Sequence, residues 1–398
     1  MNILFLTHRL PYAPNRGDRV RAFHLLKEMS RWANVDVVAL VHDDEEAGHA
    51  SDLDGMVRSV SVARVPRFRN LVKAVASLPT SRPTTHSLLN SPELGASVDR
   101  LAEARLPDLV MSYCTGIGPA ALRASLAGVP LVLDMVDVDS EKWNALSQRS
   151  RPPRSWIYQR EARVLRPFER RMAELARVCL VVNHREKEAL ARIAPGARVA
   201  VVENGVDIDT LAPPHAPMGD PVVVFCGVMD YAPNVEGVIW FANSVWPAVR
   251  AAHPGARFDV VGARPTRAVR ALQSVTGIAV TGEVPDVKPY LWKAAVAVAP
   301  LLAARGLQNK VLEAVAAGLP AVVTAPVNEG LPPEVRPACR VAADGPQFAT
   351  AVIDLLRQSS VTRRAVAESA NLRGLAWERR LSPLQSLLLA ARDAFAAR

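Results

Sequence analysis

Short apolar runs rich in β-branched residues alternate with helix-like runs along almost the whole chain of 398 residues. This alternation is typical of parallel sheets, because a parallel strand needs a crossover connection, usually a helix, before the next strand. In the first half, strands are predicted over residues 3–7, 35–41, 57–65, 109–112, 130–135 and 178–182. In the second half, they are predicted over residues 222–226, 258–261, 278–280, 294–302 and 321–324. The chain is therefore predicted to be α/β, with two doubly wound parallel sheets.

A change of domain is expected near residue 205. A chain of this length can bury two cores of ordinary size. An Asn-Gly pair at residues 204–205 and several prolines between 213 and 221 indicate a connection between them. We therefore expect domains over residues 1–205 and 206–376. The remaining residues, 377–398, are predicted to be helical with one apolar side, formed by Leu381, Leu384, Leu388, Ala391 and Phe395.

Residues 304–314 form the most informative segment, reading Ala-Arg-Gly-Leu-Gln-Asn-Lys-Val-Leu-Glu-Ala between two predicted strands. A glycine turn that leads into a helix leaves backbone N–H groups unpaired, and such a terminus suits phosphate or sugar hydroxyls. Here these groups belong to Gly306, Leu307, Gln308, Asn309 and Lys310. Lys310 adds a positive charge, and Glu313 could accept two hydrogen bonds from a diol such as a ribose. The alternative is an ordinary strand–helix–strand unit with a capped helix.

With Gly-x-Pro following it, this segment resembles the donor-nucleotide site of retaining, family-4-type glycosyltransferases. The matching residues are Gly306, Leu307, Asn309, Glu313, Ala314, Gly318 and Pro320. The resemblance implies the GT-B fold, in which two Rossmann-like domains face a central cleft, with the acceptor side N-terminal and the donor side C-terminal. It also implies transfer of a sugar from a nucleotide diphosphate to a hydroxyl with retention, and a last helix, 377–398, that crosses back to the first domain. Arg305 departs from the family, which has a glutamate in contact with the donor sugar at this place.

The same resemblance assigns two further turns of the second half to the donor site. The loop after the strand at 222–226 reads Gly-Val-Met-Asp-Tyr-Ala-Pro-Asn, and the family uses this loop to supply an arginine and a lysine to the diphosphate. Here Gly227, Met229 and Asn234 occupy it without those cations. Glu283 and Val284 lie on the turn that touches the nucleobase through main-chain atoms in the family. Together with the 304–314 segment, the loop resembles a narrower subgroup of exopolysaccharide sugar transferases, including those found beside PEP-CTERM/exosortase systems.

The first loop of the chain is basic. Arg16, Arg19 and Arg21 surround Gly17, and the Gly-x-Gly-x-x-Gly fingerprint of dinucleotide-binding folds is absent after the first strand. The loop resembles the glycine-containing first loop of GT-B enzymes, which meets the donor phosphates or the acceptor. A solvated basic loop is the alternative. His8, just past the carboxyl end of the first strand, lies where open α/β sheets bind ligands, although a lone histidine there is often structural.

Asp137 and Asp139 follow the strand predicted at 130–135. Many family-4 enzymes carry a histidine on this loop, and the alignment places Val136 there instead. Either aspartate could orient or deprotonate an acceptor hydroxyl, and either could equally cap the following helix. The Asp-x-Asp spacing also suggests a metal site, but the resemblance implies donor binding without a metal. We therefore expect neither a metal nor any other cofactor besides the nucleotide-sugar co-substrate.

Residues 147–177 carry nine arginines against three glutamates, with an apolar stripe formed by Ile157, Val164, Phe168, Met172 and Leu175. This fits an amphipathic helix on an anionic membrane surface, and it also fits the commoner case of a helix packed on its own domain with a solvated basic face. The net charge of +9 also permits nucleic acid, which is disfavoured because aromatic residues are not interleaved with the arginines. The resemblance to family-4 glycosyltransferases implies a nucleotide-sugar donor and a glycan, lipid-linked or small-molecule acceptor as partners.

The cysteine pattern and the chain start indicate a cytoplasmic location. Four scattered cysteines without a CxxC pair argue against metal or disulfide frameworks, and the first residues lack the features of a signal peptide. If residues 147–177 bind anionic lipid, the expected location is peripheral, on the inner face of the plasma membrane. Two rival functions remain open. One is a nucleotide-sugar epimerase of the same fold. The other is a non-catalytic GT-B scaffold of a polysaccharide assembly, which would explain the missing histidine, glutamate and loop cations.

Overall fold

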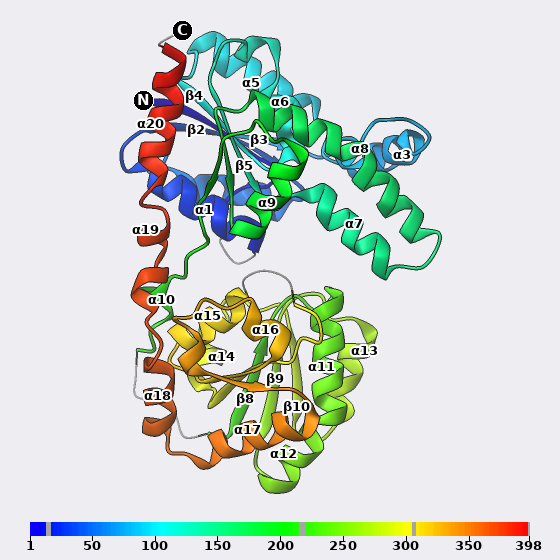
Figure 1. Cartoon of the computed structure of the whole chain (residues 1–398), viewed down its shortest axis with the longest axis vertical. Helices are drawn as coiled ribbons and strands as arrows, with labels where there is room; N and C mark the ends of the chain where they lie inside the picture. The colour runs from blue at the N-terminus through cyan, green and yellow to red at the C-terminus, as the bar shows by residue number, and fades with distance from the viewer. Residues whose placement is uncertain (13–16, 215–219, 305–307, 397–398) are drawn as a thin grey trace. The chain divides into compact units, whose positions relative to one another are not determined.

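The computed structural model describes residues 1–12, 17–214, 220–304 and 308–396. The chain forms two compact units (Figure 1). The N-terminal unit comprises Met1–Asn204 together with Arg380–Arg398, and the C-terminal unit comprises Gly205–Arg379. The last helix, α20 (Leu384–Ala396), therefore belongs to the N-terminal unit, where Leu384, Leu388 and Ala391 are buried. Arg305, Gly306, Leu307 and Arg16 lie outside the described residues.

The N-terminal unit is built on a seven-stranded sheet in the order β3-β2-β1-β4-β5-β6-β7, in which every neighbouring pair is parallel. The strand order reverses between β1 and β4, and ligands of doubly wound sheets bind outside the carboxyl ends of the strands at such a point. The strands are β1 Asn2–Thr7, β2 Asn34–Val41, β3 Ser59–Arg64, β4 Leu109–Tyr113, β5 Leu131–Val136, β6 Val178–Val181 and β7 Val199–Val201. Besides α20, its helices are α1 Gly17–Ser30, α2 Asp44–Gly48, α3 Arg67–Ser77, α4 Thr84–Leu88, α5 Pro92–Ala104, α6 Gly118–Ala121, α7 Asp139–Arg149, α8 Arg154–Leu175 and α9 His184–Ile193.

The C-terminal unit repeats this plan with six parallel strands in the order β10-β9-β8-β11-β12-β13, which reverses between β8 and β11. The strands are β8 Val222–Cys226, β9 Arg257–Val261, β10 Ile278–Gly282, β11 Val296–Ala299, β12 Ala321–Thr324 and β13 Cys339–Ala342. The helices are α10 Ile208–Leu211, α11 Ala232–Ser244, α12 Trp246–Ala252, α13 Arg267–Ala271, α14 Lys288–Lys293, α15 Asn309–Ala316, α16 Ala325–Glu329, α17 Gly345–Arg357, α18 Ser360–Glu368 and α19 Trp377–Arg380.

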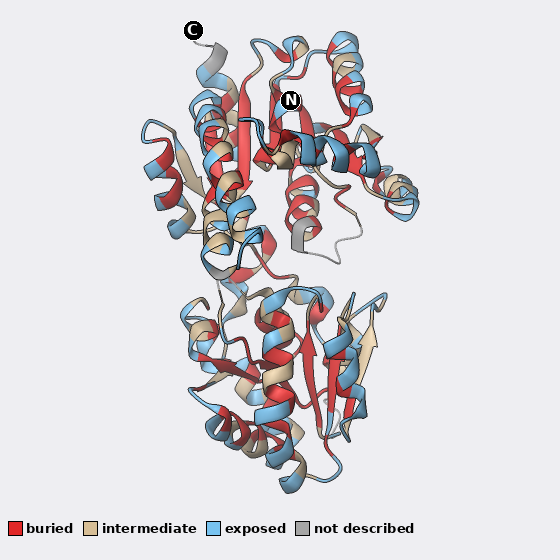
Figure 2. Ribbon diagram, turned by 90° about the vertical axis from the view of Figure 1, so that its right-hand side faces the viewer, coloured by how far each residue is buried: buried red, intermediate tan, exposed pale blue. Residues whose placement is uncertain are grey.

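Each sheet forms the core of its own unit. All residues of β8, β11 and β12 are buried, because helices cover both faces of a doubly wound sheet and leave strands that are apolar throughout. Figure 2 shows these buried strands between helices whose outer faces are exposed. The α/β class and the two doubly wound parallel sheets predicted from the alternation are thereby confirmed.

The predicted elements were wrong in four places. Strands β7 and β13 were missed, because each is a short strand at the edge of its sheet and is only partly buried. The sequence also predicts one helix over residues 235–249, whereas the structure has two, because Pro247 in the first turn of α12 lacks the backbone N–H that would continue α11. The continuous helical stretch expected over 147–177 breaks between α7 and α8, where Pro152 and Pro153 lack backbone N–H donors.

The apolar stripe predicted for residues 147–177 is also partly wrong. Ile157 and Leu175 are exposed, although Met172 is buried as expected. The face of α8 that packs on the unit instead contains Glu161, Ala162, Leu165, Glu169, Met172 and Ala173. Two glutamates can lie there because both are hydrogen-bonded, Glu161 by Thr84 and Thr85, and Glu169 by the backbone N–H of Ser140. In the part of the chain that the structure describes, no helix is long and apolar enough to cross a membrane.

Candidate functional site

The carboxyl edge of the C-terminal sheet gathers a lysine, an asparagine and an aromatic ring at the point where the strand order reverses. Lys310, in the first turn of α15, donates a 2.6 Å hydrogen bond from Nζ to Oδ1 of Asn234. The amide nitrogen of Asn234 donates to the carbonyl of Val228 at 2.8 Å, which fixes the amide so that its oxygen faces the lysine. The ammonium also lies 4.5 Å from the ring centroid of Phe225, at the end of β8, a cation–π contact. Lys310 is therefore held in one position by two different elements.

Gly227 lies against this pair, and a larger residue would not fit there. A Cβ at this position would come within 2.8 Å of the amide nitrogen of Asn234 and 3.2 Å of the Lys310 Nζ. The loop after β8 also approaches Gly262 closely, since a Cβ on Gly262 would lie 1.8 Å from the carbonyl oxygen of Gly227. The backbone can thus pass beside the ammonium without a side chain in between.

Burial sets the electrostatics of this edge. It lowers the pKa of Lys310 to about 8, although the neighbouring Cys226 and Glu313 oppose the shift. Burial also raises the pKa of Glu313, which Lys310 opposes. A positive and a negative group are therefore both held away from bulk water, three residues apart on α15. Such charges interact strongly with a bound ligand because the effective dielectric constant around them is low.

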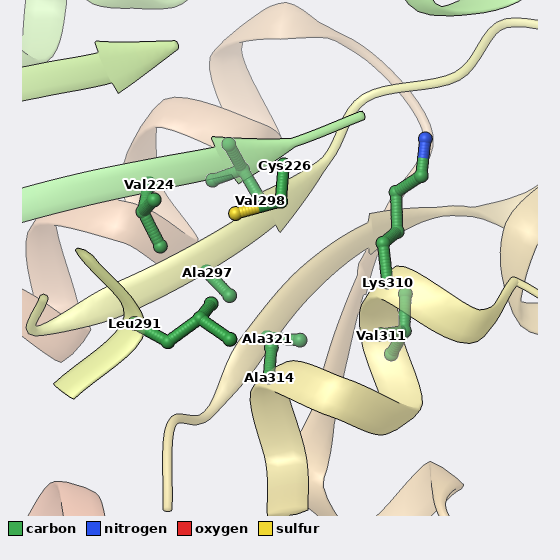
Figure 3. Close-up of a pocket in the computed structure, with 9 residues that line it drawn as sticks. All are labelled: Val224, Cys226, Leu291, Ala297, Val298, Lys310, Val311, Ala314 and Ala321. Carbon is green, nitrogen blue, oxygen red and sulfur yellow. The ribbon is translucent and has the colours of Figure 1, made fainter. Parts of the chain in front are cut away.

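A pocket lies beneath the start of α15 (Figure 3). Its lining is apolar apart from Cys226 and Lys310, and the lysine extends away from the apolar side chains toward the end of β8. The lining residues are Val224, Cys226, Leu291, Ala297, Val298, Lys310, Val311, Ala314 and Ala321. The apolar lining residues belong to the core of the unit. They pack beneath the Lys310 side chain and offer a ligand no polar contacts.

The residues predicted to bind a donor in this unit fall into two groups. Lys310, Asn234, Gly227 and Glu313 come together as described. Met229 does not join them, because its side chain is fully buried in the core.

The other described residues that were predicted to bind the donor lie at the start of α15 and on the turn after β10. Gln308 precedes α15 without a side-chain cap, and the buried Asn309 Oδ1 has no hydrogen-bond partner among the described residues. Glu283 is exposed on the turn after the edge strand β10, and Val284 is partly buried.

The N-terminal unit has a second polar group at the carboxyl edge of its own sheet. Asp139 begins α7, and its carboxylate accepts a 3.2 Å hydrogen bond from the Thr115 hydroxyl after β4. Burial raises the pKa of Asp139. Asp137 is exposed, and neither aspartate caps α7, whose N-cap residue is Val138. The capping alternative is therefore wrong.

The backbone around these aspartates is strained, which the sequence did not reveal. Val136 has φ 62° and Cys114 has φ 67°, at the ends of the paired strands β5 and β4. The left-handed region is unfavourable for a β-branched residue, and such strain gathers at functional sites. Beside Cys114, the His8 imidazole stacks on Tyr113 and its Nδ1 lies 3.4 Å from the Cys114 sulfur. His8 is thus part of this edge, and its place after β1 was the signal in the sequence.

The basic first loop does not present its described arginines to solvent. Arg21 is buried and forms a 2.9 Å ion pair with Asp134, and it donates to the carbonyl of Val202 and the side chain of Asn204. Arg19 pairs with Glu46 at 3.1 Å. Gly17 begins α1. Arg21 therefore links several segments inside the N-terminal unit, and these contacts lend no support to its predicted role in donor binding. The alternative of a solvated loop is wrong for both Arg19 and Arg21.

Known families match both units. Residues 16–205 match a family described as "Glycosyl transferase 4-like domain", and residues 220–358 match one described as "Glycosyl transferases group 1". Together the two matches cover most of the chain. It is a glycosyltransferase.

Solved structures agree with this assignment at the level of the fold. The glycosyltransferase is similar to sucrose-phosphate synthase from Thermosynechococcus elongatus, with 16% identity, full coverage of both chains and a TM-score of 0.66. HepE from Anabaena in complex with UDP-glucose gives 16% identity, full coverage of both chains and a TM-score of 0.63. An α,α-trehalose-phosphate synthase (UDP-forming) from Burkholderia vietnamiensis gives 15% identity over 100% of this chain and 96% of that one, with a TM-score of 0.54. No curated protein matches the chain.

These comparisons confirm the GT-B fold of the glycosyltransferase. They leave the exopolysaccharide subgroup as a prediction. Among the described residues, no group of three or more histidine, cysteine, aspartate and glutamate side chains could hold a metal ion. Asp137 and Asp139 therefore belong to no such group in the part of the chain that the structure describes. The expected independence from metal and other cofactors stays a prediction.

Proposed function

We propose that this glycosyltransferase transfers a sugar from a nucleotide diphosphate to a hydroxyl, with retention of configuration, and that its C-terminal unit binds the donor. The observation that carries the proposal is the Lys310 ammonium, fixed by Asn234 and Phe225 at the start of a helix and kept from bulk water. Two of the similar structures support the choice of donor: one contains UDP-glucose, and the other is described as UDP-forming.

Charge stabilisation is the proposed role of Lys310. As the bond to the sugar breaks, negative charge grows on the leaving diphosphate. A buried ammonium and the backbone N–H groups of a helix N-terminus stabilise that charge without reorganisation, in the manner of an oxyanion site. Glu313, one turn further along α15, would accept hydrogen bonds from the ribose hydroxyls. Glu283 and Val284 would contact the nucleobase through their backbone.

Arg305 would face the donor sugar or its β-phosphate, where the family has a glutamate. Such a cation selects an acidic donor sugar, or it replaces the cations that the loop at Gly227–Asn234 lacks. The substitution Arg305→Glu tests both roles, since either predicts a clear loss of donor affinity by isothermal titration calorimetry. Unchanged affinity would rule them out.

On the acceptor side, Asp139 is the proposed general base. Its raised pKa brings it closer to the range in which a carboxylate accepts a proton effectively, and Thr115 holds it in place. Asp137, which is exposed, would orient the acceptor. Retention can be tested by recording the anomeric proton of the product by NMR. A product with inverted configuration would contradict the proposed mechanism.

A role in exopolysaccharide or cell-surface glycan synthesis follows from the subgroup resemblance, with a glycan, a lipid-linked sugar or a small molecule as acceptor. The proposed location is the cytoplasm, on the inner face of the plasma membrane. The net charge of +9 favours contact with anionic lipid. Residues 147–177 were the predicted contact.

A non-catalytic scaffold is the second candidate, favoured by one observation. Val136, whose backbone has φ 62°, stands in the alignment where family members carry a histidine. A scaffold would bind the nucleotide sugar tightly and release no nucleotide with any acceptor. Nucleotide release that depends on an acceptor would exclude it, and acceptor-dependent release is also incompatible with an epimerase.

A further inference from the structure

Helix α3 (Arg67–Ser77) turns its apolar side away from the protein. Its buried residues are Asn70, Ala74 and Ser77, which are polar or small. Its large apolar side chains are exposed, by 82% for Phe68, 57% for Leu71, 56% for Val72 and 59% for Val75. A surface helix normally packs its apolar stripe on the core and its polar side in water. In α3 this arrangement is reversed.

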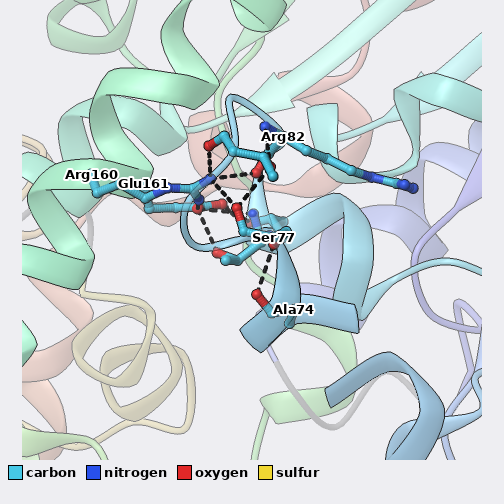
Figure 4. A network of polar contacts seen from close by, with 8 residues as sticks. Ala74, Ser77, Arg82, Arg160 and Glu161 are labelled. Carbon is cyan, nitrogen blue, oxygen red and sulfur yellow. Dashed lines mark hydrogen bonds and ion pairs between the residues drawn. The ribbon is translucent and has the colours of Figure 1, made fainter. Parts of the chain in front are cut away.

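Polar contacts fix the helix in this orientation. The amide of Asn70 donates to the carbonyls of Leu88 at 2.9 Å and Asn90 at 2.8 Å, beside α4. At the other end, Arg160 of α8 donates to the carbonyls of Ser77 at 2.8 Å, Thr80 at 2.5 Å and Arg82 at 2.7 Å (Figure 4). A rotation of α3 that buried its apolar side would break these hydrogen bonds. It is unfavourable because a buried polar group without a partner costs free energy.

Cations border the apolar row on both sides. At about 100° per residue, the four apolar side chains span about 100° of the helix, with Arg67 next to one edge and Arg69 and Lys73 beyond the other. The helix contains no acidic residue. Arg67 lies 3.7 Å from Asp43, whereas no carboxylate lies within ion-pair distance of Arg69 or Lys73 among the described residues. An apolar face between two basic edges is the composition of a helix that lies in the headgroup region of a membrane.

An exposed tryptophan stands near the end of this helix. Trp156 of α8 is 66% exposed and precedes Arg160 by four residues, so both lie on the same side of α8. Arg160 contacts the last residue of α3 and the loop that follows it, so the turn of α8 that carries Trp156 and Arg160 lies near the C-terminal end of α3. Tryptophan is enriched at the boundary between lipid and water.

We propose that α3 is a membrane-docking helix, which inserts Phe68, Leu71, Val72 and Val75 among the acyl chains of an anionic bilayer while Arg67, Arg69 and Lys73 bind its headgroups. Anionic lipid is the occupant that fits, because the face is apolar in the middle and basic at both edges. This places the membrane contact on residues 67–77 rather than on the basic face of 147–177. The inference concerns the membrane partner and does not depend on the donor chemistry.

Flotation with lipid vesicles tests the proposal at low salt, using phosphatidylcholine vesicles with and without phosphatidylglycerol. The wild-type chain should float with the anionic vesicles and much less with the neutral ones. The double variants Phe68→Ser/Leu71→Ser and Arg69→Glu/Lys73→Glu should each lower the fraction bound by about tenfold or more. Because these side chains are exposed, both variants should keep the wild-type melting temperature and circular dichroism spectrum.

Two matched variants provide controls. Leu106→Ser/Val361→Ser removes two other exposed apolar side chains, and Arg163→Glu/Arg171→Glu reverses two exposed charges of α8. Both should float like the wild type.

Three outcomes would overturn the proposal: wild-type chain that stays in solution with anionic vesicles, a loss as large in the α8 variant as in the α3 variants, or α3 variants that float normally. A wild-type dimer that Phe68→Ser/Leu71→Ser converts to a monomer, without vesicle binding, would assign the face to a second copy instead. Donor affinity, measured separately, should be the same in all variants and so distinguishes this result from failure of the proposed function.

Discussion

Lys310 is the residue on which the proposed donor chemistry of the C-terminal unit depends. Its environment combines a hydrogen bond to Asn234, the ring face of Phe225 and the absence of a side chain at Gly227. Each of these groups comes from a different part of the chain, and together they hold a charged group where water is scarce. A lysine held in this way needs no rearrangement when an anionic ligand arrives.

Donor affinity should therefore depend on pH in a range where an ordinary lysine does not titrate. Because burial lowers the pKa of Lys310 to about 8, the free site loses its positive charge as the pH rises through that value. We expect the affinity for the nucleoside diphosphate to be constant up to about pH 7 and to fall between about pH 7.5 and 9.5. Titration calorimetry across this range measures it. In Lys310→Arg, whose side chain stays protonated, the fall should disappear, and a fall that persists would assign it to another group.

The buried pair of Arg21 and Asp134 should be essential to the stability of the N-terminal unit. Removing one partner leaves the other charged and buried, so Arg21→Met should lower the free energy of unfolding by about 3–5 kcal/mol. In the double variant Arg21→Met/Asp134→Leu, most of that loss should be recovered, because no buried charge remains. Urea unfolding measures both variants. A double variant no more stable than Arg21→Met alone would show that Arg21 acts mainly through Val202 and Asn204.

The sequence indicated candidate residues for the proposed donor edge, but it did not indicate their contacts. The segment around Lys310 was recognisable from its glycine, asparagine and glutamate spacing. The partner of Lys310 is 76 residues away, and that of Arg21 is 113 residues away, so neither pairing could be deduced from local spacing. The burial of Met229 could not be predicted either, because it results from packing against residues that are distant in the sequence.

At the scale of the elements, one of the contacts that join α7 to α8 is made by a buried carboxylate. Glu169 of α8 is fully buried and accepts a 3.0 Å hydrogen bond from the backbone N–H of Ser140 in α7. Burial raises its pKa to about 7. The folded chain therefore binds this proton more tightly than the unfolded chain, and stability is lost as the pH rises from about 4.5 to about 7.

Replacing the carboxylate by an amide should remove that loss. Glu169→Gln keeps an oxygen to accept from Ser140 and cannot ionise. We expect it to be as stable as the wild type near pH 4 and more stable above pH 7, by about 2–3 kcal/mol at most. Thermal or urea unfolding at both pH values measures the difference, with Glu174→Gln, an exposed neighbour on α8, as the control. A gain that is the same at both pH values would contradict the assignment.

Element boundaries were predictable where burial was complete and failed where it was partial. Strands β8 and β11 are apolar throughout, so their runs stood out in the sequence. The edge strands β7 and β13 are short and half-buried, which leaves them little apolar signal. Helix α3 was not singled out, because an amphipathic pattern in a sequence does not say which side faces the protein.

At the scale of the whole molecule, each unit has its own doubly wound sheet and its own polar carboxyl edge. The N-terminal edge carries Asp139, Thr115 and His8, and the C-terminal edge carries Lys310, Asn234 and Glu313. The fold explains why both sites lie at comparable places, since each follows the reversal of strand order. The proposed donor residues of the C-terminal unit can therefore be tested without changing the edge of the N-terminal sheet.

The central claim is that a nucleotide sugar binds at Lys310 and Glu313. A thermal-shift screen tests it with UDP, GDP, ADP, dTDP, CDP and their common sugars, using the wild type, Glu313→Ala, Lys310→Ala and the exposed control Glu334→Ala. We predict that one nucleotide family raises the melting temperature of the wild type and the control by roughly 5 °C at a hundredfold excess over Kd. Both site variants should lose the shift. No shift with any of these ligands, or a shift that both site variants retain, would contradict the account.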